Sequence, residues 1–160
     1  MSGIGLEDLK SGTPWWGGKG IGVGDTVEGI IVSASKEQQT DFDTGQGLVW
    51  DNGDPRMESV IIFDSDLRNS EIENDDGKRA LHLRGGKYEA AEGSGTSGED
   101  ALREAMQKAG LRAEAGVKIK AAITGMAKPT GRGRNAAKLW TIRLEKAELP
   151  EGLGEEDIFG

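Results

Sequence analysis

The residue types best suited to chemistry lie toward the C-terminal end of the sequence, where a basic segment interrupts an acidic chain. Between Val117 and Lys146 there are eight Lys and Arg side chains and one acid, Glu145. Nucleic-acid phosphates are bound mainly by such cationic side chains, so we predict phosphate contacts from this segment. The predicted residues are Lys118, Lys120, Lys128, Arg132, Arg134, Lys138 and Arg143, with Arg56, Arg84 and Lys87 as contributors from a second strand on the same face. The alternative is a solvated hairpin whose charges discourage edge-to-edge aggregation.

Aromatic side chains are few, so each is a candidate for a specific role. Single-stranded nucleic acids are held by basic grooves together with aromatic rings on which the bases stack. The candidate stacking residues are Trp15, Trp16, Phe42, Trp50 and Trp140. Ordinary packing against the core is the alternative for each of them. It is the prediction for Phe63, which lies within an apolar run.

Signals for catalysis or metal binding are weak. The sequence has no cysteine, which excludes disulfides, thiolate nucleophiles and thiolate metal sites. His82 is the only histidine, and no nucleophile motif accompanies it. Residues 41–45 begin like a calcium loop, but the twelfth position is Asn52 instead of a bidentate glutamate. We therefore expect a protein that is not an enzyme, with no catalytic residues, no metal and no cofactor.

The net charge of the 160-residue chain is -8, which at first argues against a nucleic-acid partner. Part of this charge is concentrated in residues 148–160, which contain five acids and no base. We expect this acidic tail to be disordered and its end to bind a partner protein. The residues predicted to do so are Glu155, Glu156, Asp157, Ile158 and Phe159. A solubilising terminus is the alternative.

The sequence shows no sign of a membrane protein. No apolar run approaches the roughly 20 residues that cross a bilayer. The first ten residues also lack the basic and then hydrophobic order of a secretory signal. We therefore expect a cytoplasmic protein with no membrane partner.

A short-stranded fold must position these side chains, because apolar runs alternate with glycine-rich and acidic turns. Strands are predicted over residues 25–35, 56–64, 79–88, 116–128 and 136–147. The third strand is interrupted at Gly85 and Gly86, and the first is expected to be buried on both faces because it is rich in β-branched residues. A capping box that starts at Thr96 or Ser97 predicts a helix, and Gly110 should end it.

The order of these elements predicts a mostly β fold, specifically a five-stranded OB-fold barrel with one helix between strands 3 and 4. The OB-fold domain would span residues 25–147. Residues 1–24 would form a glycine-rich N-terminal arm in which only the tryptophan pair could act as an anchor. Residues 148–160 would form the acidic C-terminal tail.

Four stretches of the chain carry a family resemblance, namely residues 13–20 (TPWWGGKG), 23–25 (VGD), 38–45 (QQTDFDTG) and 50–57 (WDNGDPRM). With these strings the chain resembles the single-stranded DNA-binding proteins of actinobacterial phages and prophages, and the resemblance covers most of residues 13–146. It implies an OB-fold protein that coats single-stranded DNA during phage DNA replication or recombination. The end of the tail is also similar to the acidic tip of bacterial single-stranded DNA-binding proteins, which recruits replication and repair proteins. It departs from that tip in lacking a proline and in adding Gly160 after Phe159.

The sequence therefore predicts a protein that binds and protects single-stranded DNA without strong sequence preference. A homo-oligomer is compatible with this reading. Two alternatives stay open. One is a structural or protein-interaction β-barrel, such as a virion or replisome component, and the other is an RNA-binding OB module, which the 2′-hydroxyl would distinguish.

Overall fold

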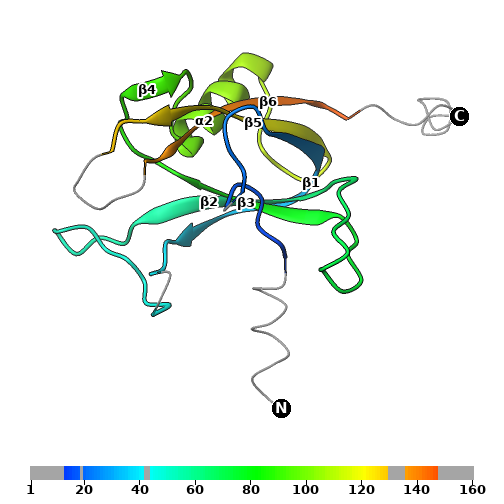
Figure 1. The fold of residues 1–160 in the computed structure, drawn as a ribbon, viewed down its shortest axis with the longest axis horizontal. Helices are drawn as coiled ribbons and strands as arrows, with labels where there is room; N and C mark the ends of the chain where they lie inside the picture. The colour runs from blue at the N-terminus through cyan, green and yellow to red at the C-terminus, as the bar shows by residue number, and fades with distance from the viewer. Residues whose placement is uncertain (1–12, 19, 42–43, 130–135, 148–160) are drawn as a thin grey trace, which may run out of the picture.

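The computed structural model describes residues 13–18, 20–41, 44–129 and 136–147, and in those ranges it contains six strands and one helix (Figure 1). The prediction of a mostly β fold with a single helix is confirmed. The elements in chain order are β1 (Thr26–Gln38), β2 (Met57–Asp64), β3 (Lys78–Arg84), β4 (Ala90–Gly93), α2 (Gly98–Ala109), β5 (Val117–Ala127) and β6 (Lys138–Lys146).

The strand count differs from the five that the sequence predicts, because β4 is an additional strand that precedes the helix. β3 ends at Arg84, before the double glycine, and the chain re-enters the sheet at Ala90. β4 has the sequence AAEG, which lacks the β-branched and aromatic residues typical of strands. It forms because it lies beside the end of β5, where Ala90 pairs with Ala127. Tertiary pairing therefore creates this strand against its local propensity.

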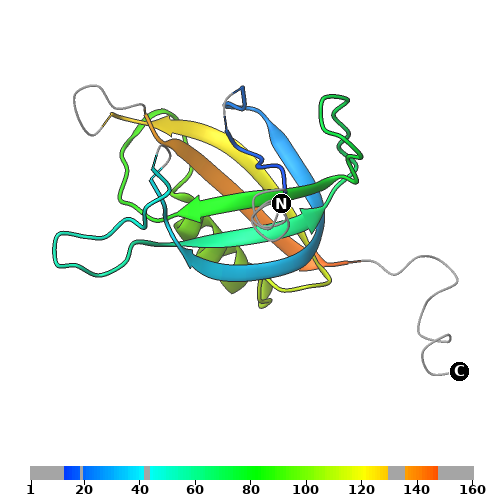
Figure 2. The same cartoon turned by 90° about the horizontal axis from the view of Figure 1, so that it is seen from below.

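All strand pairs are antiparallel, and the sheet runs in the order β3-β2-β1-β5. β5 pairs with β6 along one edge and with β1 and then β4 along the other. β1 serves both halves of the sheet, since its first residues pair with β5 and the rest with β2. Figure 2 shows how strongly it curves between them. Gly29 lies in this shared region, and a Cβ atom there would overlap the backbone carbonyl of Asp64.

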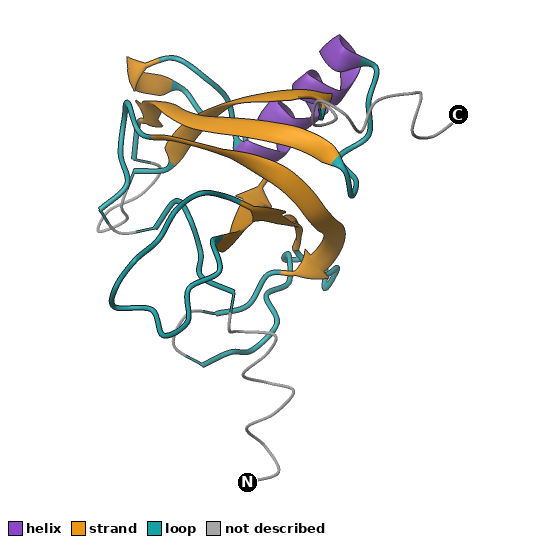
Figure 3. Cartoon of the chain, turned by 90° about the vertical axis from the view of Figure 1, so that its right-hand side faces the viewer, coloured by secondary structure: helices purple, strands orange, loops and turns teal. Residues whose placement is uncertain are grey.

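The sheet is not closed, because β3 and β6 do not pair with each other within the described residues. α2 packs against both of these strands and so lies across the opening between them. Figure 3 shows the helix beside the strands at one end of the molecule. The predicted caps are confirmed: the Ser97 hydroxyl accepts a hydrogen bond from the Asp100 N–H, and Gly110 ends the helix in the left-handed conformation.

The core is formed by apolar side chains that alternate along the strands and by the inner side of α2. Phe63, Leu81 and Ile123 are completely buried, which confirms the predicted core position of Phe63. The prediction that the first strand is buried on both faces is wrong. Val27 and Ile31 point into the core, but Ile30 and Val32 are exposed because the outward side of β1 is open to solvent.

Residues 13–18, here called the strap, extend the sheet beyond β3. The Trp16 N–H donates to the Ala80 carbonyl, and the Ala80 N–H donates to the Pro14 carbonyl, each at 2.9 Å. The Trp16 ring belongs to the core cluster. The second half of the predicted N-terminal arm is therefore packed onto the domain, with Trp16 as its anchor.

No helix in the described part of the chain is long and apolar enough to cross a membrane, since α2 has only twelve residues.

Candidate nucleic-acid interface

The outward sides of β2 and β3 form a surface that we call the β2–β3 face. Side chains alternate along a strand, so Ile61 and Leu81 point into the core while Glu58, His82 and Arg84 lie on the other side of the sheet. Glu58 is nevertheless buried there, at 6% exposed, beneath its neighbours. In the strand register Glu58 lies opposite Arg84. Three ionisable side chains are thereby brought together from two strands.

The Glu58 carboxylate joins this group. It lies 2.7 Å from the His82 Nδ1 atom and accepts a hydrogen bond from Arg84 Nε at 2.8 Å. Burial raises the pKa of the Glu58 carboxyl, but the hydrogen bonds and charges of His82 and Arg84 together outweigh it, so the net pKa is lowered. The carboxylate is therefore ionised at neutral pH and forms an ion pair with Arg84. The Arg84 side chain remains half exposed, so part of its guanidinium is free to meet a phosphate.

Trp15 provides an aromatic surface beside this group. Its ring meets the His82 imidazole edge-on, with ring centroids 6.0 Å apart. The Trp15 side chain is 52% exposed, although it is held between His82 and the backbone of Gly18. A ring that is both held and exposed has the properties of a stacking platform for a base.

Trp50 provides a second exposed ring, on the loop that connects β1 and β2. It is 53% exposed, and the Arg56 guanidinium lies over one side of the ring at 4.5 Å from the centroid. Arg56 is two residues before Glu58 and so lies on the same side of this extended segment. Residues 48–56 of this loop are joined by backbone hydrogen bonds, which include Arg56 N–H to the Leu48 carbonyl and Trp50 N–H to the Asp54 carbonyl.

The two rings lie at different levels along the β2–β3 face, Trp15 near its middle and Trp50 just before β2 begins. Trp15 is level with His82, which pairs with Val60, and Trp50 is level with Arg56. Four residues of strand separate these levels, which corresponds to about 13 Å. Arg84 lies at the level between them, because it pairs with Glu58, and Arg56 lies against Trp50.

The basic segment does not form one continuous stripe. Lys118 lies 3.4 Å from Glu145 and 3.9 Å from Glu28, so its charge is shared with two acids. Lys120 and Arg143 face each other across β5 and β6 and are exposed. This pair lies on the outward side of β5 and β6, and β1 and β2 separate it from β3 in the sheet.

Three of the predicted contact residues are packed or hydrogen-bonded within the protein. Trp16 and Trp140 are 6% and 8% exposed and pack edge-on against each other at 5.9 Å. Neither ring presents a face to a base, so their assignment as stacking platforms is not supported. The Lys138 ammonium donates to the carbonyls of Gly17 and Gly18 at 2.7 and 2.6 Å and is therefore engaged within the protein.

The remaining predicted residues lie in loops or outside the described part of the chain. Lys128, which directly follows β5, is exposed and forms an ion pair with Glu89 at 3.0 Å. Lys87 is also exposed and lies with Glu89 on the connection between β3 and β4. β5 ends and β6 begins on the same side of the molecule as the loop of Trp50 (Figures 1 and 2). The predicted residues that fall outside the described ranges are Phe42, Arg132, Arg134, Glu155, Glu156, Asp157, Ile158 and Phe159.

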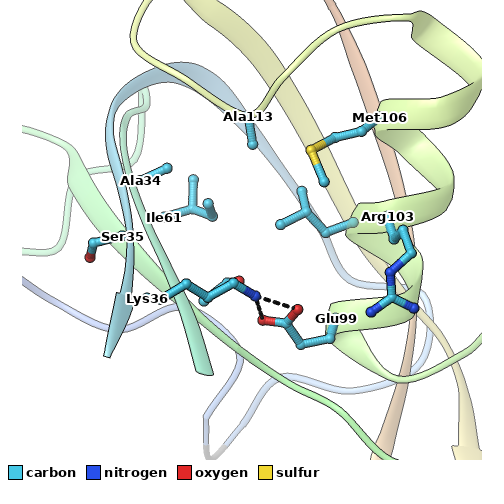
Figure 4. Close-up of a pocket in the computed structure, with 10 residues that line it drawn as sticks. Ala34, Ser35, Lys36, Ile61, Glu99, Arg103, Met106 and Ala113 are labelled. Atoms are coloured by element: carbon cyan, nitrogen blue, oxygen red, sulfur yellow. Dashed lines mark hydrogen bonds and ion pairs between the residues drawn. The ribbon is translucent and has the colours of Figure 1, made fainter. Parts of the chain in front are cut away.

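A groove of about 330 Å³ lies between α2 and the inward sides of β1 and β2 (Figure 4). Its walls are mainly apolar and include Ile61, Leu102 and Met106. Lys36 and Glu99 form an ion pair at 2.8 Å across its rim. The groove opens on the side opposite the outward-facing His82. In the part of the chain that the structure describes, no group of three or more His, Asp and Glu side chains is placed to hold a metal ion.

No protein-family model, no curated protein and no solved structure matches this chain.

Sequence reasoning missed two features of this surface. One is the role of Glu58 and His82, which strand alternation could have placed on the outward face beside Arg84. The other is that the Trp15 ring is exposed while the Trp16 ring is buried. Adjacent residues of an extended segment point to opposite sides, so only one of the two rings can be buried.

Proposed function

We propose that this protein binds single-stranded DNA with little sequence preference, through the β2–β3 face together with Trp15 and Trp50. The observation that carries this proposal is the presence of two half-exposed indole rings on one surface, each held in place beside ionisable or cationic side chains. Stacking on an aromatic ring is tolerant of sequence because every base has a π face. Arg84 supplies positive charge between the levels of the two rings, and Arg56 supplies it beside Trp50.

The fold we propose is a partly open OB-fold barrel in which β4 is an added edge strand. Support comes from the path β3-β2-β1-β5-β6, from a long curved β1 shared by both halves, and from a helix that covers the opening. OB-folds bind oligonucleotides on the face of strands 2 and 3 and on two flanking loops. The corresponding elements here are β2, β3, the loop of Trp50 and the connection between β5 and β6.

The proposed biological role is the coating of single-stranded DNA during phage DNA replication or recombination. It rests on the resemblance to the phage proteins, which is carried by the motifs within residues 13–57. In this proposal the acidic tail recruits replication or recombination proteins through its last residues. Lys120 and Arg143 would add a second phosphate-binding patch when the strand is long enough to pass around the sheet.

The proposal is tested by titrating fluorescein-labelled oligo-dT with the full chain at two salt concentrations. Binding should weaken steeply with salt, with a logarithmic slope of about -0.7 for each phosphate neutralised. Trp50→Ala should weaken binding, whereas Leu67→Ala removes an exposed apolar side chain from a different loop and should leave binding unchanged. Absent or salt-insensitive binding would contradict the proposal. Tighter binding of a matched oligo-U would instead favour the RNA module.

A further inference from the structure

The strap is attached to the two strands that the sheet leaves unpaired with each other. Its first half hydrogen-bonds to β3 through Ala80. Its second half is held by β6, because the Lys138 ammonium donates to the carbonyls of Gly17 and Gly18. The strap therefore bridges β3 and β6 by direct bonds, on the segment that also carries Trp15 and Trp16.

Two glycines allow the strap to fit this position. Gly17 has a φ of +116°, and a Cβ atom there would lie 3.0 Å from the Trp140 ring. A Cβ atom at Gly18 would lie 3.1 Å from the Trp15 ring. The backbone can therefore contact both rings closely only because these positions lack side chains.

Lys138 is partly buried at this junction. Burial lowers the pKa of its ammonium, and only the charge of Asp25 acts in the opposite direction. Two carbonyl acceptors at 2.7 and 2.6 Å compensate for the lost hydration. An ammonium engaged in this way is not available to a phosphate, although the sequence pattern places it in the basic segment.

The position of Trp15 follows from the anchoring of Trp16. The two residues are adjacent, so fixing the Trp16 ring against Trp140 on the inside directs the Trp15 ring outward, where it meets His82. Any loosening of the strap would release both rings together.

We propose that Lys138 is a positioning residue that holds the strap and thereby holds Trp15 as a platform, so that DNA binding and attachment of the strap are coupled. The inference rests on the proposed function, because it concerns how one stacking ring is kept ready. Coupling of this kind is reciprocal. A strand stacked on Trp15 stabilises the strap, and the attached strap strengthens binding of the strand.

The test uses Lys138→Met, which keeps the aliphatic stem but removes the ammonium, and Lys108→Met as a matched control. Lys108 is an exposed lysine in the last turn of α2. Hydrogen exchange at the Trp16 and Ala80 amides measures strap attachment without DNA. Affinity for oligo-dT at several salt concentrations measures binding and the number of phosphates contacted.

We expect Lys138→Met to speed exchange at both amides and to weaken oligo-dT binding, each by about ten-fold. The salt dependence of binding should not change, because Lys138 contacts no phosphate. In the unaltered protein, oligo-dT should slow exchange at the same amides. Lys108→Met should have none of these effects.

Two results would overturn the inference. If Lys138→Met lowers the salt slope by about 0.7 and leaves amide exchange unchanged, Lys138 is a phosphate contact instead. If exchange becomes faster but affinity is unaltered, the strap does not position Trp15. Should the unaltered protein fail to bind oligo-dT at all, the proposed function fails, while the exchange measurement still tests whether Lys138 holds the strap.

Discussion

Trp15 and Trp16 are adjacent in sequence, yet their replacement by alanine should affect different properties, DNA affinity for Trp15 and stability for Trp16. The Trp15 ring is half exposed and touches His82, whereas the Trp16 ring is buried against Trp140. Loss of a base-stacking ring weakens binding by about 1 to 3 kcal/mol. Loss of a buried tryptophan lowers the free energy of unfolding by about 3 to 5 kcal/mol.

These magnitudes can be separated by two assays on the same pair of variants. Trp15→Ala should raise the dissociation constant for labelled oligo-dT by about five-fold to 150-fold, measured by fluorescence anisotropy. Its urea unfolding midpoint should stay close to that of the unaltered protein. Trp16→Ala should lower the unfolding midpoint strongly, because the cavity that it leaves adjoins the core.

Trp15→Phe provides the control for ring chemistry, since phenylalanine can still stack and should retain much of the affinity. The reasoning would be refuted if Trp15→Ala bound oligo-dT as tightly as the unaltered protein. It would also be refuted if Trp15→Ala lost as much stability as Trp16→Ala, because the exposed ring would then be a packing residue.

Three further predictions concern charge, close packing and the tail. The folded-state pKa of Glu58 is lowered, so its contribution to stability is present above the unfolded value of about 4.3 and is lost as pH falls through the folded pKa. Glu58→Gln should therefore lower the free energy of unfolding by about 1 to 2 kcal/mol at pH 7, and urea unfolding should show this difference shrinking below about pH 4; a difference independent of pH would contradict the assignment. Gly29→Ala should lower the free energy of unfolding by about 1 to 3 kcal/mol, and with it the urea midpoint, because its Cβ would overlap Asp64. Gly22→Ala serves as its control, since a Cβ atom there meets no atom within 4 Å. Equal midpoints for these two variants would contradict the close approach. Removal of residues 148–160 should tighten oligo-dT binding at low salt, since five acids then no longer compete with phosphates, and the gain should vanish at high salt; unchanged affinity in anisotropy titrations at low salt would mean that the tail does not contact the interface.

The strands with strong local patterns could be predicted from the sequence, and those that depend on neighbours could not. β2 and β5 contain runs of apolar and β-branched residues, and their bounds agree with the prediction to within one residue. The helix was predictable because Ser97 and Gly110 mark its ends by their own chemistry. β4 was not, because its sequence has no strand propensity and it forms only by pairing with β5.

The candidate site shows the same division. Counting charges identified a basic segment, but residue type does not reveal where an ammonium points. Lys138 has the same chemistry as Lys120, yet one is bonded to the strap and the other is exposed. Likewise, four tryptophans divide into two buried and two half-exposed rings. That division depends on the path of the strap and on contacts between residues more than a hundred positions apart.

The strap also has a consequence for the handling of the protein in solution. A sheet margin with unpaired N–H and C=O groups is a template for pairing with another chain. Ala80 would present such groups on β3, but both of its backbone groups are bonded to the strap. Thr13 to Gly18 thus protect this part of the β3 edge from pairing with another chain. A shortened chain that began after Gly18 would expose the unpaired backbone groups of Ala80, together with the cavity left by Trp16, and should self-associate more readily.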